Sequence, residues 1–143
     1  MDRQKSLNAL GYNVRVVCGF PGVGKTRARS EKTIDLNLAN HPQEDWIGVI
    51  RSSMATGKIV MVSSWSNLRR DLRNAGIEYM IVYPSSRLRN AYLERLLTRK
   101  RLREKYKRKI SSQFDNMLRS CMDDPSPYHI RLESTDENLN DFI

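Results

Sequence analysis

The stretch from Gly19 to Thr26, GFPGVGKT, constrains the fold of this chain more than any other. It places three glycines and a lysine directly after a short β-rich run, Val14 to Cys18. Glycine has no Cβ atom, so such a loop can bring successive backbone N–H groups to one point. The context predicts a strand, a tight loop and a helix that begins near Lys25.

The same stretch fits the pattern G-x-x-x-x-G-K-[ST] in full, which is typical of a loop that binds the phosphates of a nucleotide. Lys25 is then expected to reach the β- and γ-phosphates of ATP, and the Thr26 hydroxyl to bind Mg²⁺. ATP and Mg²⁺ are therefore the expected cofactors. The expected cofactor-binding residues of the loop are Gly19, Phe20, Pro21, Gly22, Val23, Gly24, Lys25, Thr26 and Arg27.

Apolar runs alternate with helical patterns along the rest of the chain. The clearest strand is 58–64, a continuous apolar run of the kind that is buried on both faces of a parallel sheet. This alternation predicts a single α/β domain over 1–143, with the three-layer P-loop NTPase fold and a mainly parallel sheet of about five strands. Strands are expected at 14–18, 33–36, 58–64, 77–83 and 128–132, and helices after Pro42, Ser66 and Ser85 and over about 106–122.

The charge of the chain is unevenly distributed. Residues 1–122 hold 24 Lys and Arg against 10 Asp and Glu, a balance of +14, whereas the segment 123–143 has a balance of −5. The densest basic run, RKRLREKYKRK, covers 99–109 and is followed much later by an acidic tail, 133–143, that could form a final helix. A cationic surface indicates polyanionic ligands, which are nucleotides or nucleic acid.

Other features limit the class of protein. The longest apolar runs are too short to span a bilayer, and the N-terminus has no apolar signal region, so no membrane partner is expected. Cys18 and Cys121 provide neither a disulfide framework nor metal-ligand spacing, and we expect a protein of the reducing cytoplasm. The sequence carries no information on oligomeric state.

Three absences in the sequence distinguish among P-loop proteins. No N-K-x-D string occurs, and the D-x-x-G match at Asp45 to Gly48 does not follow an apolar strand, which argues against a GTPase. The buried strand 58–64 ends in Ser63 and Ser64 rather than in an acid, which argues against dedicated hydrolysis. A kinase depends less on such an acidic residue, because its catalysis is mostly positioning and charge stabilisation.

A kinase also needs cations that close over the transferred phosphoryl group. The sequence Arg95-Leu-Leu-Thr-Arg99 resembles the start of the lid in nucleoside monophosphate kinases. The resemblance implies a short basic helical lid over about 95–109, with Arg99 as the first catalytic candidate. Arg95, Arg101 and Arg103 are the further candidates for contact with the ATP phosphates.

The middle of the chain resembles the small P-loop nucleotide kinase-like proteins encoded by bacteriophages. The shared features are a strand that ends in Ser-Ser, a strand of the form G-I-x-(apolar) … V-Y-P, and a Y-L-E-R helix, within about 14–123. The resemblance implies a nucleoside monophosphate kinase-like fold. It implies a protein located in the cytoplasm of the host cell. It also implies transfer of the γ-phosphoryl group of ATP to a (deoxy)nucleoside monophosphate.

The chain departs from related kinases at the acceptor side. The D-G-F-P-R element of adenylate kinases and the D-R pair of thymidylate kinases are missing. Asp35 is the only acid near the expected end of the second strand, so it is either a base or Mg²⁺ ligand, or an aspartate that caps a turn. Arg87 and Arg89 could hold the acceptor phosphate, and Trp65 could stack on a base or belong to the core.

Two alternatives to a nucleotide kinase stay open. The first is a kinase that acts on nucleic acid, at a 5′-hydroxyl end or a hydroxymethylated base, through the basic run 99–109. The second is a module that binds ATP and holds nucleic acid or a protein partner with little turnover. Residues 37–48, the loop in which we expect acceptor specificity, carry no motif that identifies the acceptor.

Overall fold

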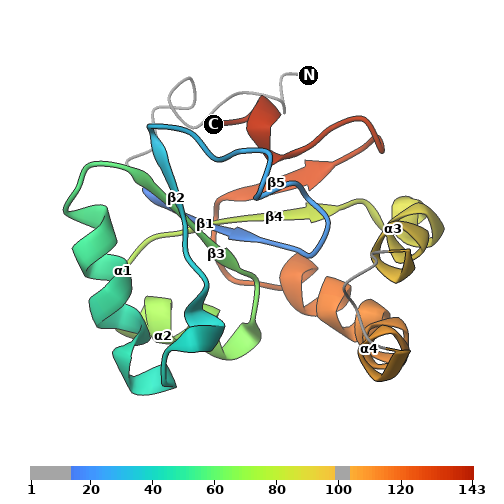
Figure 1. Cartoon of the computed structure of the whole chain (residues 1–143), viewed down its shortest axis with the longest axis horizontal. Helices are drawn as coiled ribbons and strands as arrows, with labels where there is room; N and C mark the ends of the chain where they lie inside the picture. The colour runs from blue at the N-terminus through green and yellow to red at the C-terminus, as the bar shows by residue number, and fades with distance from the viewer. Residues whose placement is uncertain (1–13, 99–103) are drawn as a thin grey trace.

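The computed structural model describes residues 14–98 and 104–143 and shows an all-parallel sheet of five strands (Figure 1). The strand order is β2-β3-β1-β4-β5, so β1 is central and pairs with β3 and β4. The expected α/β class and the parallel sheet are confirmed. The strands are β1 Val16–Gly19, β2 Thr33–Asp35, β3 Ile59–Ser63, β4 Met80–Pro84 and β5 His129–Leu132.

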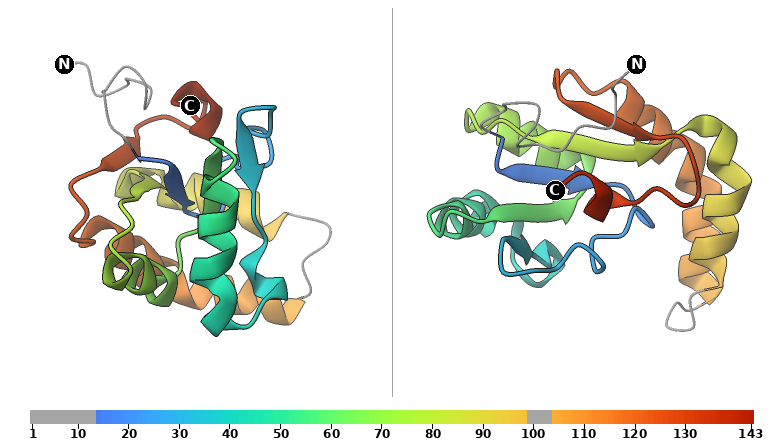
Figure 2. Two further views of the ribbon diagram at one scale, coloured as in Figure 1. Left: turned by 90° about the vertical axis from the view of Figure 1, so that its left-hand side faces the viewer. Right: turned by 90° about the horizontal axis from the view of Figure 1, so that it is seen from above.

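Within the described residues, four α-helices lie in the connections from β2 onward. Figure 2 shows α1, α2 and α4 on one face of the sheet, while α3 lies beyond the carboxyl ends of the strands. Residues 95–97 end α3 and 104–109 begin α4, and the rest of the expected lid, 99–103, lies outside the described residues. The helices are α1 Trp46–Met54, α2 Ser66–Asn74, α3 Arg89–Leu97 and α4 Glu104–Met122, with short 3₁₀ helices η1 Leu38–Asn40, η2 Gln43–Asp45, η3 Ser86–Leu88 and η4 Leu139–Asp141.

The opposite face of the sheet differs from the expected three-layer arrangement. Among the described residues, the C-terminal segment 133–143 with η4 lies over this face, and no α-helix does (Figure 2). The segment anchors itself with Leu139 and Phe142, both fully buried in the same core as β1 and β3. The tail that was expected to form a final helix is therefore a short 3₁₀ turn that covers the sheet.

The most informative departure follows the glycine loop, because the α-helix expected near Lys25 is absent. Residues 24–29 form a single helical turn, in which the Ala28 N–H donates to the Gly24 carbonyl at 3.1 Å. The Thr33 hydroxyl ends this turn by donating to the Ala28 carbonyl at 2.8 Å and accepting from the Ser30 N–H at 2.9 Å. The chain enters β2 at Thr33, so a longer helix has no room.

The expected end of α2 is confirmed in detail. Gly76 has φ of +71°, and the Ile77 N–H donates to the Leu72 carbonyl at 2.9 Å, as in a Schellman motif. Because Ile77 still belongs to this cap, β4 begins at Met80, three residues later than the apolar run predicts. Among the described residues, no helix is both long enough and apolar enough to span a membrane.

Candidate functional site

The glycine loop has a backbone suited to anions. Gly22 and Gly24 have φ of +93° and +97°, a conformation that L side chains rarely adopt. The N–H groups of Gly22, Gly24 and Thr26 donate to no group within residues 14–98 or 104–143. N–H groups without a partner, on a loop whose φ angles alternate in sign, form the kind of concavity that binds phosphate.

The loop separates two cavities, which we call the P-loop cavity and the α4 cavity. Their volumes are about 660 Å³ and about 840 Å³, within the range of small-molecule sites. Pro21, Lys25 and Ser63 line both cavities. The half-buried Lys25 places its Nζ at the junction, where it donates to the Gly19 carbonyl at 2.9 Å.

The P-loop cavity includes most of the loop residues expected from the sequence. Gly22, Gly24, Thr26 and Arg27 line it together with Arg95, Thr135 and Asn138. The expected set is not complete, because Phe20 and Val23 are fully buried in the core and Gly19 lines the α4 cavity instead. Phe20 packs edge-on against Phe114 of α4, with ring centroids 5.2 Å apart.

Arg95, expected from the sequence to contact the ATP phosphates, lies beside the glycine loop, and its contacts are to the protein itself. Its guanidinium donates to the Gly22 carbonyl at 2.9 Å and to the Thr135 carbonyl at 3.0 Å, and lies 4.6 Å from the Tyr92 ring centroid. Arg95 thus connects the glycine loop to the C-terminal segment. It adds positive charge to the wall of the P-loop cavity.

The C-terminal segment supplies site residues that the sequence pattern did not indicate. The Leu139 N–H donates to the Val23 carbonyl at 2.7 Å, and the neighbouring Asn138 begins η4 with a capping box. An added Cβ at Gly24 would lie 3.1 Å from the Asn138 Cβ. The acidic composition of the tail gave no signal of this contact, because the segment reaches the loop only through the folding of the whole domain.

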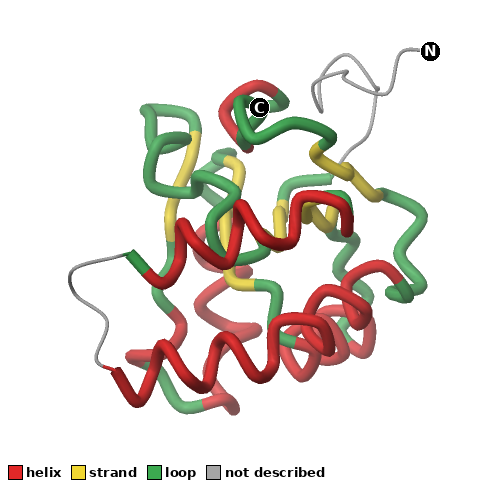
Figure 3. The backbone as a smooth tube through the Cα atoms, turned by 90° about the vertical axis from the view of Figure 1, so that its right-hand side faces the viewer, coloured by secondary structure: helices red, strands yellow, loops and turns green. Residues whose placement is uncertain are grey.

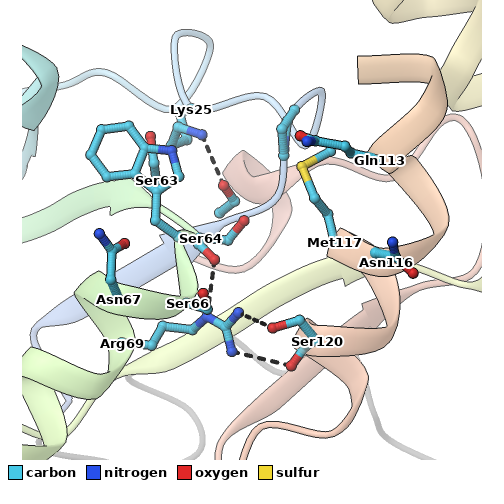
Figure 4. A pocket seen from close by; sticks show the side chains of 13 residues that line it. Lys25, Ser63, Ser64, Ser66, Asn67, Arg69, Gln113, Asn116, Met117 and Ser120 are labelled. Carbon is cyan, nitrogen blue, oxygen red and sulfur yellow. Dashed lines mark hydrogen bonds between the residues drawn. The ribbon is translucent and has the colours of Figure 1, made fainter. Parts of the chain in front are cut away.

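The α4 cavity lies between the end of β3, the start of α2 and one side of α4 (Figure 4). The stretch from the end of β3 to the start of α2 contributes Ser63, Ser64, Ser66 and Asn67, and α4 contributes Gln113, Asn116, Met117 and Ser120. Trp65 also lines it, with 37% of its surface exposed and its ring centroid 5.3 Å from that of Trp46.

A buried network anchored by Arg69 supports this cavity. Arg69 is 4% exposed, and its guanidinium donates to the Ser64 carbonyl at 2.9 Å, to Ser120 Oγ at 2.6 Å and to Asp124 Oδ2 at 2.7 Å. The contacts join the end of β3 to the last turn of α4 and the residues just after it. Sequence reasoning missed Arg69, because in the sequence it is one of several arginines on an amphipathic helix.

Asp124 is the negative partner in that network. It also accepts from the Tyr79 hydroxyl at 2.6 Å and from Arg73 at 3.1 Å. Burial acts to raise the pKa of Asp124, but the hydrogen bonds from Tyr79 and Arg69 outweigh it, and the net pKa is lowered. Burial and the bond to Asp124 raise the pKa of Tyr79, so this phenol stays protonated.

The remaining candidates lie away from the two cavities. Asp35 pairs with Arg29 at 3.2 Å, and Arg89 pairs with Asp115 at 2.6 Å. Arg87 contacts the carbonyl and the carboxylate of Glu133. The structure therefore does not bring Asp35, Arg87 or Arg89 to the site, and Arg99, Arg101 and Arg103 lie outside the described residues.

The side chains that line the two cavities fit a nucleotide that carries a magnesium ion. Among the described residues, the ionisable side chains that line the two cavities are Lys25, Arg27, Arg69 and Arg95, all cations. The exposed Thr26 lines the P-loop cavity, which fits Mg²⁺ held by one protein oxygen, phosphate oxygens and waters. Residues 14–98 and 104–143 contain no group of three or more His, Cys, Asp or Glu that could bind a metal on its own.

The chain matches no protein-family model, and neither a curated protein nor a solved structure matches it.

Proposed function

We propose that this protein transfers the γ-phosphoryl group of ATP to a (deoxy)nucleoside monophosphate. ATP occupies the P-loop cavity in this proposal, and the acceptor occupies the α4 cavity. The observation that carries it is the position of Lys25, which lines both cavities. A cation at the junction of two sites can stabilise the charge of a phosphoryl group in transit between them.

The donor half rests on the glycine loop. The N–H groups of Gly22, Gly24 and Thr26 would bind phosphate oxygens, and Lys25 would exchange the Gly19 carbonyl for a phosphate. Thr26 would hold Mg²⁺, which neutralises charge on the β- and γ-phosphates when it is bound. The P-loop at the carboxyl end of the central strand β1 supports a P-loop kinase-like fold.

The charges of the site favour a phosphate over a hydroxyl as acceptor. A hydroxyl must lose a proton during attack, which usually requires a nearby base. A nucleoside monophosphate brings an oxygen that is already anionic near neutral pH. Lys25, which lines both cavities, suits such an anion, and Arg99, Arg101 and Arg103 are the sequence candidates to complete the site.

A transfer assay tests the proposal. We expect label from γ-labelled ATP on nucleoside monophosphates, and no label on any acceptor with Lys25→Ala. Lys32→Ala is the matched control, because Lys32 is exposed and lines neither cavity, and it should transfer like the unmodified protein. Label on none of the acceptors, with ATP binding intact, would leave a binding module in place of a kinase.

One observation favours a second candidate, a kinase whose acceptor is part of a nucleic acid. The exposed residues Lys105, Arg108 and Lys109 lie at the start of α4, and Lys109 precedes the cavity residue Gln113 by one helical turn. The sugar-phosphate backbone of a nucleic acid could continue from the cavity along these cations. Including 5′-hydroxyl oligonucleotides and DNA with hydroxymethylated bases among the acceptors separates this candidate from the first.

A further inference from the structure

Three side-chain amides face the α4 cavity. Gln113 and Asn116 are three positions apart on α4, so they share one face of the helix, and neither side chain hydrogen-bonds to any residue that the structure describes. Asn67 of α2 uses its carbonyl oxygen for the Leu68 N–H at 3.0 Å. Figure 4 shows Asn67 on one side of the cavity, with Gln113 and Asn116 on the other.

The same cavity has a flat aromatic wall and an adaptable apolar one. Trp65 is held against the buried Trp46, which leaves part of the Trp65 surface exposed at the cavity. Met117 extends from α4 toward the cavity, on the same side as Gln113 (Figure 4). An aromatic surface and a thioether are suited to pack against a planar ring.

Charge is confined to one end of the cavity. Lys25 lies at the junction with the P-loop cavity, whereas the charge of Arg69 is paired with Asp124 in the buried network. The amides are neutral: Gln113 and Asn116 each present two N–H donors and a carbonyl acceptor, and Asn67 presents its two N–H donors. The complementary ligand is anionic at one end and carries a planar ring with hydrogen-bonding edges at the other.

We infer that the α4 cavity recognises the nucleobase of the acceptor, through the amides of Gln113, Asn116 and Asn67 and the ring of Trp65. The inference rests on the proposed function, because it takes this cavity as the acceptor site. It places base specificity on α4 and at the start of α2. The loop 37–48, where specificity was expected, lines neither cavity.

Binding measurements test this without any need for turnover. By calorimetry, at least one nucleoside monophosphate should bind about tenfold or more tightly than ribose 5-phosphate, which carries the phosphate but no base. The double variant Gln113→Ala/Asn116→Ala should reduce that difference, with Asn67 and Trp65 still in place, and leave the affinity for ATP unchanged. Both residues are exposed, so the melting temperature should also stay the same.

Ser111→Ala is the matched control, since Ser111 is an exposed polar residue of α4 that lines neither cavity. Gln113→Glu keeps the length of the side chain but removes both amide donors, and it should change the order of affinity among nucleoside monophosphates. Equal binding of ribose 5-phosphate and every nucleoside monophosphate, or an unchanged order in the Glu variant, would overturn the inference.

The two proposals fail in different ways. If nucleoside monophosphates bind with the expected base dependence but receive no label from ATP, the kinase function is wrong and the base site stands. If label is transferred with the same KM in the unmodified protein and in Gln113→Ala/Asn116→Ala, the function stands and base recognition by α4 is wrong.

Discussion

Gly24 shows how closely one residue couples the glycine loop to the rest of the protein. Its positive φ gives the loop its shape, and its missing side chain leaves space for Asn138 of the C-terminal segment. Gly57 has a similar φ of +81° but has nothing within 4 Å of an added Cβ atom. Comparing the same substitution at the two glycines therefore separates the effect of backbone strain from the effect of a close contact.

We predict that Gly24→Ala reduces ATP affinity much more than Gly57→Ala does. Both variants should lose about 1–2 kcal/mol of folding stability to the strained backbone. Only Gly24→Ala should displace Asn138 and distort the donors that face phosphate. Urea unfolding measures the first effect and ATP titration the second; equal ATP affinity in the two variants would contradict this account.

Asp124 is the residue on which the buried network depends most. We predict that Asp124→Asn costs about 3–5 kcal/mol of unfolding free energy, because the buried Arg69 would lose its ionic partner. Chemical denaturation of the two proteins at neutral pH measures this cost. Asp71→Asn is a suitable control, since Asp71 lies on the same helix as Arg69 and its carboxylate accepts from the exposed Gln43 side chain at 3.1 Å.

The pH dependence of stability follows from the same carboxyl group. Its pKa is lower in the folded chain than the value of about 3.9 expected in the unfolded chain. Its stabilising contribution is therefore complete above about pH 4 and is lost as the pH falls through the folded pKa. Melting temperatures between pH 2 and 7 should show a smaller acid-induced decrease for Asp124→Asn than for the unmodified protein.

At the scale of elements, the C-terminal segment replaces a missing helix. A single turn follows the glycine loop, so the sheet face near the loop would be open without η4 and its flanking residues. Leu139 and Phe142 cover that face, and the Leu139 N–H bonds to the Val23 carbonyl. The segment thus contributes to both the core and the P-loop cavity.

Phe142→Ala is predicted to lower the unfolding free energy by about 3–5 kcal/mol, as for other fully buried phenylalanines. Because the segment contacts the glycine loop, the variant should also weaken ATP binding. Asn140→Ala changes an exposed residue of the same 3₁₀ helix and should leave both properties unchanged. An unchanged ATP affinity in Phe142→Ala would show that the segment does not support the loop.

At the scale of the whole molecule, positive charge is concentrated outside the C-terminal segment. The balance is +14 over 1–122 and −5 over 123–143, and the C-terminal segment 133–143 within the latter packs beside the P-loop rather than beside the start of α4. The exposed cations at the start of α4 are therefore left available for a polyanion.

If single-stranded nucleic acid binds there, replacing Lys105, Arg108 and Lys109 with Gln should weaken binding and reduce its salt dependence. Three lost phosphate contacts would lower the slope of log affinity against log salt concentration by about 2. ATP affinity should not change, because these residues do not line the P-loop cavity. Oligonucleotide titrations at several salt concentrations provide the measurement, and an unchanged slope would place any such binding elsewhere.

Much of the element order could be predicted because its signals are local. Continuous apolar runs indicated β1, β3 and β4, and Gly57 and Gly76 marked the ends of α1 and α2. The helix expected after the glycine loop was wrong, since its local pattern gave no sign that Thr33 would terminate the turn. Asp35, Arg87 and Arg89 line neither cavity and instead pair with nearby residues of opposite charge, which no local pattern in the sequence indicated.

The sequence by itself determined the position of the glycine loop and of Lys25, and from them the prediction of a phosphate site, because a glycine loop is specified by neighbouring positions. Only the tertiary structure decided that Lys25 lies between two cavities, and that α4 and the C-terminal segment complete their walls. Those walls depend on contacts such as Arg95 to Gly22, 73 positions apart, and Arg69 to Asp124, 55 positions apart. Such pairs meet through the packing of helices on a shared sheet, which no local pattern of residues encodes.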